Sequence, residues 1–189
     1  MTIALITPPQ SEPLSLDDIK LHLRIDHDHE DALLVDVLKA ARQYCEHASG
    51  QKLITQAWRQ YETVFPHDRA ISLLVAPVQS VAAVTAFDRD GNPSVLGVDD
   101  FTFQSRWDPQ SITIGHDLDP SIAANGFEVD LVAGMGDMST DVPDTLKRAI
   151  LLLVAHWYEF RGAVSPQDQP VSIPAGFETM VRPWKGPKL

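Results

Sequence analysis

The segment from Val142 to Gly162 constrains the fold more than any other part of the sequence. Apolar residues recur there at spacings of three and four, the period of one helix face. These residues are Leu146, Ile150, Leu153, Trp157 and Phe160. Other apolar residues lie between them, so the helix is apolar on most sides and is expected to be buried among neighbours. Pro143 suits its first turn and Gly162 suits its end. Its most apolar part, residues 149–155, is far shorter than the about 20 residues that a membrane span needs.

Two amphipathic helices are predicted nearer the N-terminus. Ser15 and Asp18 have the spacing of a capping box, so a short helix is expected to begin there. A longer helix is expected over residues 30–48 and should end at Gly50. Cys45 is the one cysteine of the chain and falls on the apolar face of this second helix. It is therefore predicted to be a small core residue rather than a reactive thiol.

Residues 56–133 have the texture of a β-structure. Short segments rich in β-branched and aromatic residues alternate there with turn residues, which predicts six strands. The segments are residues 57–65, 71–75, 81–87, 101–105, 111–114 and 126–133. The turn-forming sequence from Asp88 to Pro93 predicts a hairpin. Strands at this spacing indicate a compact antiparallel unit.

These segments together predict an α+β fold. A small helical bundle, made of two N-terminal helices and the long C-terminal helix, is interrupted by an antiparallel β-insert and followed by an extended C-terminal tail. The expected parts are the N-terminal helices of the bundle at 1–55, the β-rich insert at 56–136, the central bundle helix at 137–162 and a docking tail at 163–189. Prolines in residues 1–14 predict an extended or loop-like start. The five prolines after Gly162 are expected to exclude a helix or a central strand from the tail.

The sequence contains no recognisable catalytic or metal-binding motif. The acidic turn from Asp26 to Asp31 does not fit a calcium loop, which would need Gly in place of Asp31 and Glu in place of Val37. The histidines of this region lack the spacing of a zinc site. Neither G-x-S-x-G nor HExxH is present. No catalytic residue, metal or cofactor is therefore predicted, and a small cytoplasmic enzyme whose carboxylates meet in space is kept as an alternative.

The C-terminal tail carries apolar and basic residues without a regular pattern. It either folds back on its own domain or docks into a partner, as an added strand or as an aromatic anchor in a groove. The candidate docking residues are Phe177, Met180, Val181, Arg182, Pro183, Trp184 and Lys185. The last ten residues contain no acid, so an acidic partner or an acidic neighbouring copy is expected.

Six sequence segments follow one another in a characteristic order. They are SLDDIKLHLRID, YCEHASGQKL, LLVAPVQSVAAVTAFDRDG, GFEVDLVAGMGD, VPDTLKRAILLLVAHWYEFRG and IPAGFETMVRPWK. In this order and spacing the chain resembles the head–tail connector (adaptor) proteins of tailed bacteriophages and of phage-derived gene transfer agents. The resemblance extends from about Leu14 to Lys185. The β-insert is a departure from the smaller members of that family, which are mainly helical.

The resemblance implies a non-enzymatic structural protein of the virion or particle neck. Such adaptors form a closed ring, usually of twelve copies, beneath the portal protein. The ring extends the DNA channel and carries the stopper or tail proteins, and the C-terminal segment reaches the portal. The protein would stay in the host cytoplasm before assembly, with no membrane association. A stopper or tail-completion protein of the same particle is the alternative within this class.

The charge balance agrees with a ring through which DNA passes. Lys and Arg number 15 and Asp and Glu number 26, a net charge of −11. An acidic surface repels phosphates, so it would let a duplex slide without sequence-specific binding. The acids concentrate between Glu12 and Asp31. The candidate channel-lining residues are Asp26, Asp28, Glu30 and Asp31.

Overall fold

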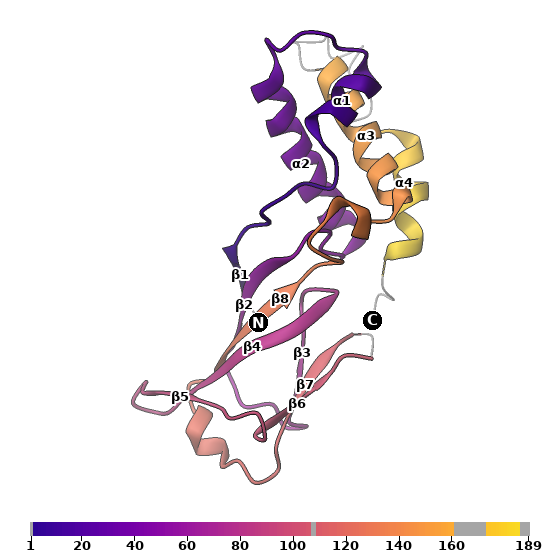
Figure 1. The fold of residues 1–189 in the computed structure, drawn as a ribbon. Coiled ribbons are helices and arrows are strands. Elements are labelled where there is room, and N and C mark those ends of the chain that lie inside the picture. The colour runs from indigo at the N-terminus through magenta and orange to yellow at the C-terminus, as the bar shows by residue number, and fades with distance from the viewer. Residues whose placement is uncertain (1, 107–108, 161–172, 186–189) are drawn as a thin grey trace. The chain divides into compact units, whose positions relative to one another are not determined.

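The chain folds into two compact units, each built from separate stretches of sequence. The computed structural model describes residues 2–106, 109–160 and 173–185. The β-unit comprises Met1–Gln10 and Thr55–Met135, and the helical unit comprises Ser11–Ile54 and Gly136–Leu189 (Figure 1). The mixture of helices and antiparallel sheet predicted from the sequence is confirmed.

The two N-terminal helices form where the sequence predicts them. Helix α1 (Leu16–Leu23) begins at a capping box, in which the Ser15 hydroxyl accepts from the backbone N–H of Asp18 at 3.1 Å and the Asp18 carboxylate accepts from the backbone N–H of Ser15 at 2.9 Å. Helix α2 (Asp31–Ser49) ends at Gly50, whose φ of 76° lies in the left-handed region that glycine adopts at low cost. Cys45 is fully buried on α2, as predicted.

Helix α3 (Asp144–Glu159) is the central element of the helical unit. It packs against α1, α2 and α4, so the predicted association of helices that are distant in sequence is confirmed. Leu146, Ile150 and Leu153 of the predicted apolar face are fully buried. Phe160, just after the helix, is 43% exposed. Gly162, the predicted end of the helix, lies outside the described residues.

The prediction of an extended C-terminal tail is wrong for residues 175–184. Helix α4 (Ala175–Val181) forms there and is followed by the 3-10 helix η3 (Arg182–Trp184). Pro174 stands directly before α4 and Pro183 stands in the first turn of η3. A proline at the start of a helix loses no hydrogen bond. These two prolines therefore mark where α4 and η3 begin and do not break them. Phe177 and Val181, one turn apart on α4, are fully buried.

The β-unit contains two antiparallel sheets. The larger has the order β1-β2-β8-β4-β5 and the smaller has the order β3-β7-β6. The strands are β1 (Thr2–Thr7), β2 (Gln56–Glu62), β3 (Ala70–Ser72), β4 (Val78–Phe87), β5 (Pro93–Val95), β6 (Phe101–Gln104), β7 (Ser111–Ile114) and β8 (Phe127–Ala133). Strand β1 corrects the assignment of residues 1–55 to the helical part, because its residues belong to the β-unit. Strand β5 was also missed.

Both sheets contribute to one apolar core. Every second residue of β8 is buried, and these residues cluster with Ile112 and Ile114 of the smaller sheet. The predicted hairpin after β4 is confirmed, with the Asp88 carboxylate accepting from the backbone N–H groups of Asp90 and Asn92 at 2.9 Å. Gly126, just before β8, has a φ of 90°, and a Cβ there would lie 1.8 Å from the carbonyl oxygen of Glu62. No helix of the described residues is long and apolar enough to cross a membrane.

Candidate partner-binding surfaces

The acidic turn between α1 and α2 is held by one lysine. Lys20 Nζ lies 2.5 Å from the Asp28 carboxylate and 2.8 Å from the Asp31 carboxylate. The two hydrogen bonds raise the pKa of Lys20, and the same contact lowers the pKa of Asp28. Two of the four candidate channel acids therefore share the charge of one ammonium group. Both still keep a face toward solvent, since the side chain of Asp28 is 89% exposed and that of Asp31 is 35% exposed.

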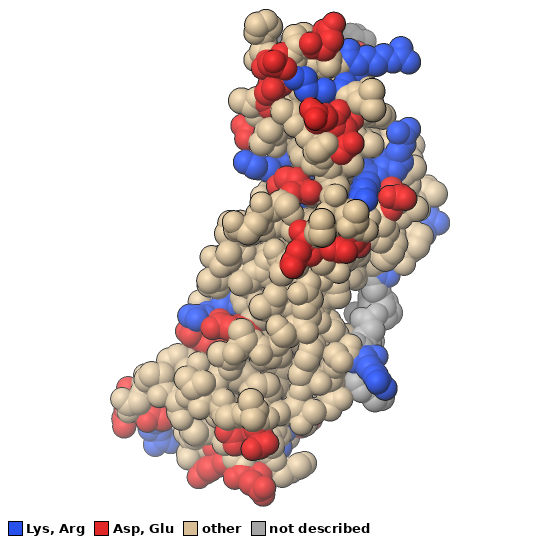
Figure 2. All heavy atoms as spheres, in the orientation of Figure 1, with Lys and Arg blue, Asp and Glu red and all other residues tan. Residues whose placement is uncertain are grey.

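The other two acids of the turn have different surroundings. Glu30 stands directly before α2 and accepts a hydrogen bond from the Tyr158 hydroxyl on α3. Asp26 is exposed. Three of the candidate acids therefore make hydrogen bonds within the fold, while Asp26 and Asp28 are both exposed. Over the described residues no group of three His, Cys, Asp or Glu side chains could hold a metal ion. On the face drawn in Figure 2, acidic and basic side chains are intermixed over the helical unit.

The seven C-terminal candidates divide into anchors and exposed groups. Phe177 and Val181 are fully buried, and the Phe177 ring lies 5.4 Å from the Tyr44 ring on α2, centroid to centroid. These two residues therefore attach α4 to the helical unit and are not available to a partner. Arg182, Pro183 and Lys185 are exposed, and Met180 and Trp184 are half-buried.

Polar contacts hold the end of this segment against the helical unit. The Trp184 indole N–H donates to the Thr145 hydroxyl at 3.3 Å, and its carbonyl accepts from the Gln51 amide at 3.3 Å. Lys185 Nζ pairs with the Glu178 carboxylate at 2.9 Å. Glu178 and Lys185 also line a hollow of about 370 Å³ with Tyr44 and the end of α2. Lys185 therefore lies beside a concave surface, which suits contact with another protein.

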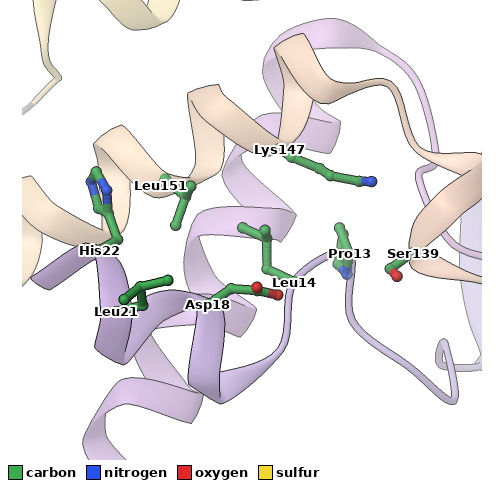
Figure 3. Close-up of a pocket in the computed structure, with 8 residues that line it drawn as sticks. All are labelled: Pro13, Leu14, Asp18, Leu21, His22, Ser139, Lys147 and Leu151. Atoms are coloured by element: carbon green, nitrogen blue, oxygen red, sulfur yellow. The ribbon is translucent and has the colours of Figure 1, made fainter. Parts of the chain in front are cut away.

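A second concave surface lies between α1 and α3, and the sequence did not reveal it. The groove, of about 420 Å³, is drawn in Figure 3. It is lined by Pro13, Leu14, Asp18, Leu21, His22, Ser139, Lys147 and Leu151. Leu21 is 81% exposed, although it is a large apolar side chain. The exposure of Leu21 alone had a signal in the sequence, because Leu21 and Leu23 compete for the inner face of α1 and only one of them can take it.

The electrostatics of this groove come from structural contacts. The hydrogen bonds from Ser15 lower the pKa of Asp18, and burial together with the nearby positive charge of Arg148 lowers the pKa of His22. Asp18 serves the capping box of α1, and Lys147 lies 3.5 Å from the exposed Asp144. The groove therefore offers leucine side chains with a carboxylate and an ammonium group nearby, an arrangement that suits a peptide segment of another protein.

Comparison with known proteins finds one family model and several solved structures that are similar to the chain. Residues 13–88 match the family model of phage gp6-like head-tail connector proteins. The relation to head–tail connectors inferred from the sequence is confirmed. The matched region contains α1, α2, β2, β3 and β4, so it includes parts of both units. No curated protein matches the chain.

Solved neck structures share the fold over its whole length. A chain in the neck of an empty gene transfer agent particle, computed with C6 symmetry, superposes with a TM-score of 0.83 at 24% identity, covering 100% of this chain and 97% of that one. A chain in the virion of a native gene transfer agent gives 0.82 at 25% identity, with the same coverage. A chain in the neck of a native particle, computed with C12 symmetry, gives 0.77 at 24% identity, again covering 100% and 97%.

Proposed function

We propose that this chain is a structural head–tail connector, or adaptor, in the neck of a tailed phage or gene transfer agent particle. The observation that carries the proposal is the match in fold over the full length of both chains, 100% of this one and 97% of the neck protein. The family match over residues 13–88 supports the same role independently of the fold. Neither a stopper or tail-completion protein nor a small enzyme is favoured by these comparisons.

The connector is proposed to act as a closed ring, of twelve copies, between the portal protein and the stopper or tail proteins. The related necks were computed with C6 and C12 symmetry, which supports a cyclic arrangement. A head-to-tail contact repeated with the right rotation closes into such a ring. DNA would pass through the lumen without sequence-specific contacts, in keeping with the net charge of −11.

Deletion of the protein from particle-producing cells tests this role. We expect DNA-containing heads without attached tails, counted by electron microscopy, and recovery of tailed particles when the intact chain is supplied again. Mass spectrometry of purified particles should find the chain in the wild type. Normally tailed particles in its absence would disprove a connector function.

The exposed cations of the C-terminal segment are proposed to contact the portal protein. Arg182 and Lys185 supply positive charge, with Met180, Pro183 and Trp184 beside them, while Phe177 and Val181 hold the helix that presents them. Replacing both cations, Arg182→Glu with Lys185→Glu, should weaken binding to purified portal by about tenfold or more, because an exposed charge pair at an interface is reversed. The matched control reverses two exposed cations elsewhere in the helical unit, Lys39→Glu with Arg148→Glu. Equal portal affinities for the two double variants would exclude this docking site.

The acidic turn is proposed to face the DNA channel, with Asp26 as an exposed member. Its exposure and the surplus of acids around it support the proposal. A substitution Asp26→Lys should slow DNA release from particles, measured with an intercalating dye, because an ammonium group attracts phosphates. Asp36→Lys, on the exposed side of α2, serves as the control. Identical release rates for both variants, or a channel wall lined by Lys and Arg, would contradict the assignment.

A further inference from the structure

Strand β1 leaves one edge of the larger sheet open. It is the first strand in the order β1-β2-β8-β4-β5, and within the described residues no strand pairs with its outer side. Its sequence, Thr-Ile-Ala-Leu-Ile-Thr, contains neither a charged residue nor a proline, and five of its six residues are exposed. The nearest charged side chain is that of Arg59, which lies opposite Ala4 on β2 and is ion-paired with Glu128 and Asp130 of β8. An uncharged edge strand of this kind is a template for a strand of another chain.

The apolar side chains of β1 continue the face of the sheet that carries the core. Ile3 is paired with Gln60 and Leu5 is paired with Trp58, and residues directly opposite each other point to the same face. Gln60 is fully buried, and its amide donates to the carbonyl of Ser72 on β3 at 2.8 Å. The smaller sheet therefore covers this face at β2. Ile3 is 36% exposed and Leu5 is 43% exposed, so the cover ends before β1.

The opposite edge of the same sheet is protected. Strand β5 starts at Pro93 and pairs only with Thr85–Phe87 of β4. The rest of β4 is irregular where it passes β8, with register shifts between Val78 and Ser80 and between Val81 and Ala83. Proline and bulges hinder the addition of a further strand. Strand β1, in contrast, is regular from Thr2 to Leu5 and shifts register only beyond Leu5. The chain thus blocks one edge and leaves the other able to pair.

We propose that β1 pairs with a second copy of this chain and that this added strand is a contact between neighbouring subunits of the ring. The inference rests on the proposed function, since a cyclic ring requires every copy to offer two different, complementary surfaces. A strand that carries no charge of its own suits a protein backbone with apolar side chains, whereas binding to nucleic acid relies on cations. Pairing of β1 with β1 would have two-fold symmetry and would stop at a dimer, so the neighbour contributes a different segment.

Photo-crosslinking in particle-producing cells tests the contact. Benzoylphenylalanine at Leu5, in an otherwise wild-type chain, should give an adduct of twice the mass of the chain, in which position 5 is linked to a segment outside residues 2–7 of another copy. The same probe at Val98, which is 87% exposed in the same unit, should give at least fivefold less of this adduct. Links from position 5 only to other proteins, or only to residues 2–7 of a second copy, would overturn the proposal.

A variant with charged residues on β1 provides a second test of the contact. Ile3→Lys with Leu5→Lys should replace rings with the 20.9 kDa monomer, measured by light scattering and electron microscopy of the neck, whereas Val98→Lys should keep the rings. Far-UV circular dichroism and the melting temperature show whether the double variant is folded. If it is unfolded, the crosslinking experiment alone tests the β1 contact. Wild-type rings from the folded double variant would overturn the contact. Absence of the chain from purified particles would count against the connector function itself, whereas a ring assembled without β1 would refute the strand addition alone.

Discussion

The buried ion pair on α2 allows the strongest test of the forces that hold the helical unit. Arg42 is 5% exposed and Glu46 is 4% exposed, and Arg42 Nη1 lies 3.2 Å from Glu46 Oε1. Arg42 Nε also donates to the Glu12 carboxylate at 2.7 Å, and Glu46 accepts from the backbone N–H of Leu53 at 3.1 Å. One turn of α2 therefore binds the segment that enters the unit and the segment that leaves it.

The substitution Glu46→Ala should cost about 4 kcal/mol of unfolding free energy. Removing one member of a buried pair costs about 3–5 kcal/mol, and the lower end applies here because Glu12 still faces Arg42. The lost acceptor for Leu53 adds about 1 kcal/mol. A loss of this size is a large part of the about 5–15 kcal/mol that stabilises a typical domain. The melting temperature should fall by about 10 °C or more.

Urea unfolding followed by circular dichroism measures this loss. Glu46→Gln keeps an oxygen acceptor for Leu53 and should lose less than Glu46→Ala. The matched surface control is Lys147→Ala, which removes an ion pair of 3.5 Å to the fully exposed Asp144 and should cost less than about 0.5 kcal/mol. A cost below about 1 kcal/mol for Glu46→Ala would refute the reasoning that burial makes this pair indispensable.

Three further predictions concern the helices. Ser15→Ala should cost about 1 kcal/mol at pH 7 by removing the cap of α1. Because the pKa of Asp18 is lowered from 3.8 in the folded state, the part of this stability due to the Asp18 carboxylate is present above pH 3.8 and is lost as the pH falls through the lower, folded-state pKa. The difference between wild type and variant in urea titrations should therefore shrink in acid to the part due to the Ser15 hydroxyl, which accepts from the backbone N–H of Asp18. Phe177→Ala should cost about 3 kcal/mol through the cavity left beside Tyr44, and equal melting temperatures of variant and wild type would contradict the buried position of α4. Burial raises the pKa of the Cys45 thiol to about 12, so a thiol reagent at pH 8 should react with it only as fast as the chain unfolds, and rapid labelling of the native protein would be the contrary result.

The sequence predicted those elements whose signals are local. The capping residues Ser15 and Asp18, the closing Gly50 and the period of α3 each act within a few residues, and all three helices formed where expected. Helix α4 was missed because the prolines were counted as helix breakers, although Pro174 stands at a position where proline costs nothing.

Strand β1 was missed for a different reason. A half-buried strand shows an alternation of apolar and polar residues, because one of its faces is covered. The sequence of β1 has no such alternation, and five of its six residues are exposed. The division of the C-terminal candidates into buried Phe177 and Val181 and exposed Arg182 and Lys185 also depends on packing against distant helices. The groove between α1 and α3 joins segments more than one hundred residues apart, and no local pattern encodes such a surface.

The interrupted β-unit has a consequence for the order in which the chain folds. Strands β1 and β2 are neighbours in the sheet, but the helical residues 11–54 separate them in the sequence. Closing a flexible loop of this length costs about 3 kcal/mol of chain entropy. Glu12 and Leu53, near the two ends of that loop, are both fastened to α2 through Arg42 and Glu46. If residues 11–54 fold first, their two ends come together before β1 and β2 pair. The two strands then do not have to find each other by a slow search across a long flexible loop. The substitution Glu46→Ala should then slow the formation of the larger β-sheet in refolding experiments, although Glu46 belongs to no strand.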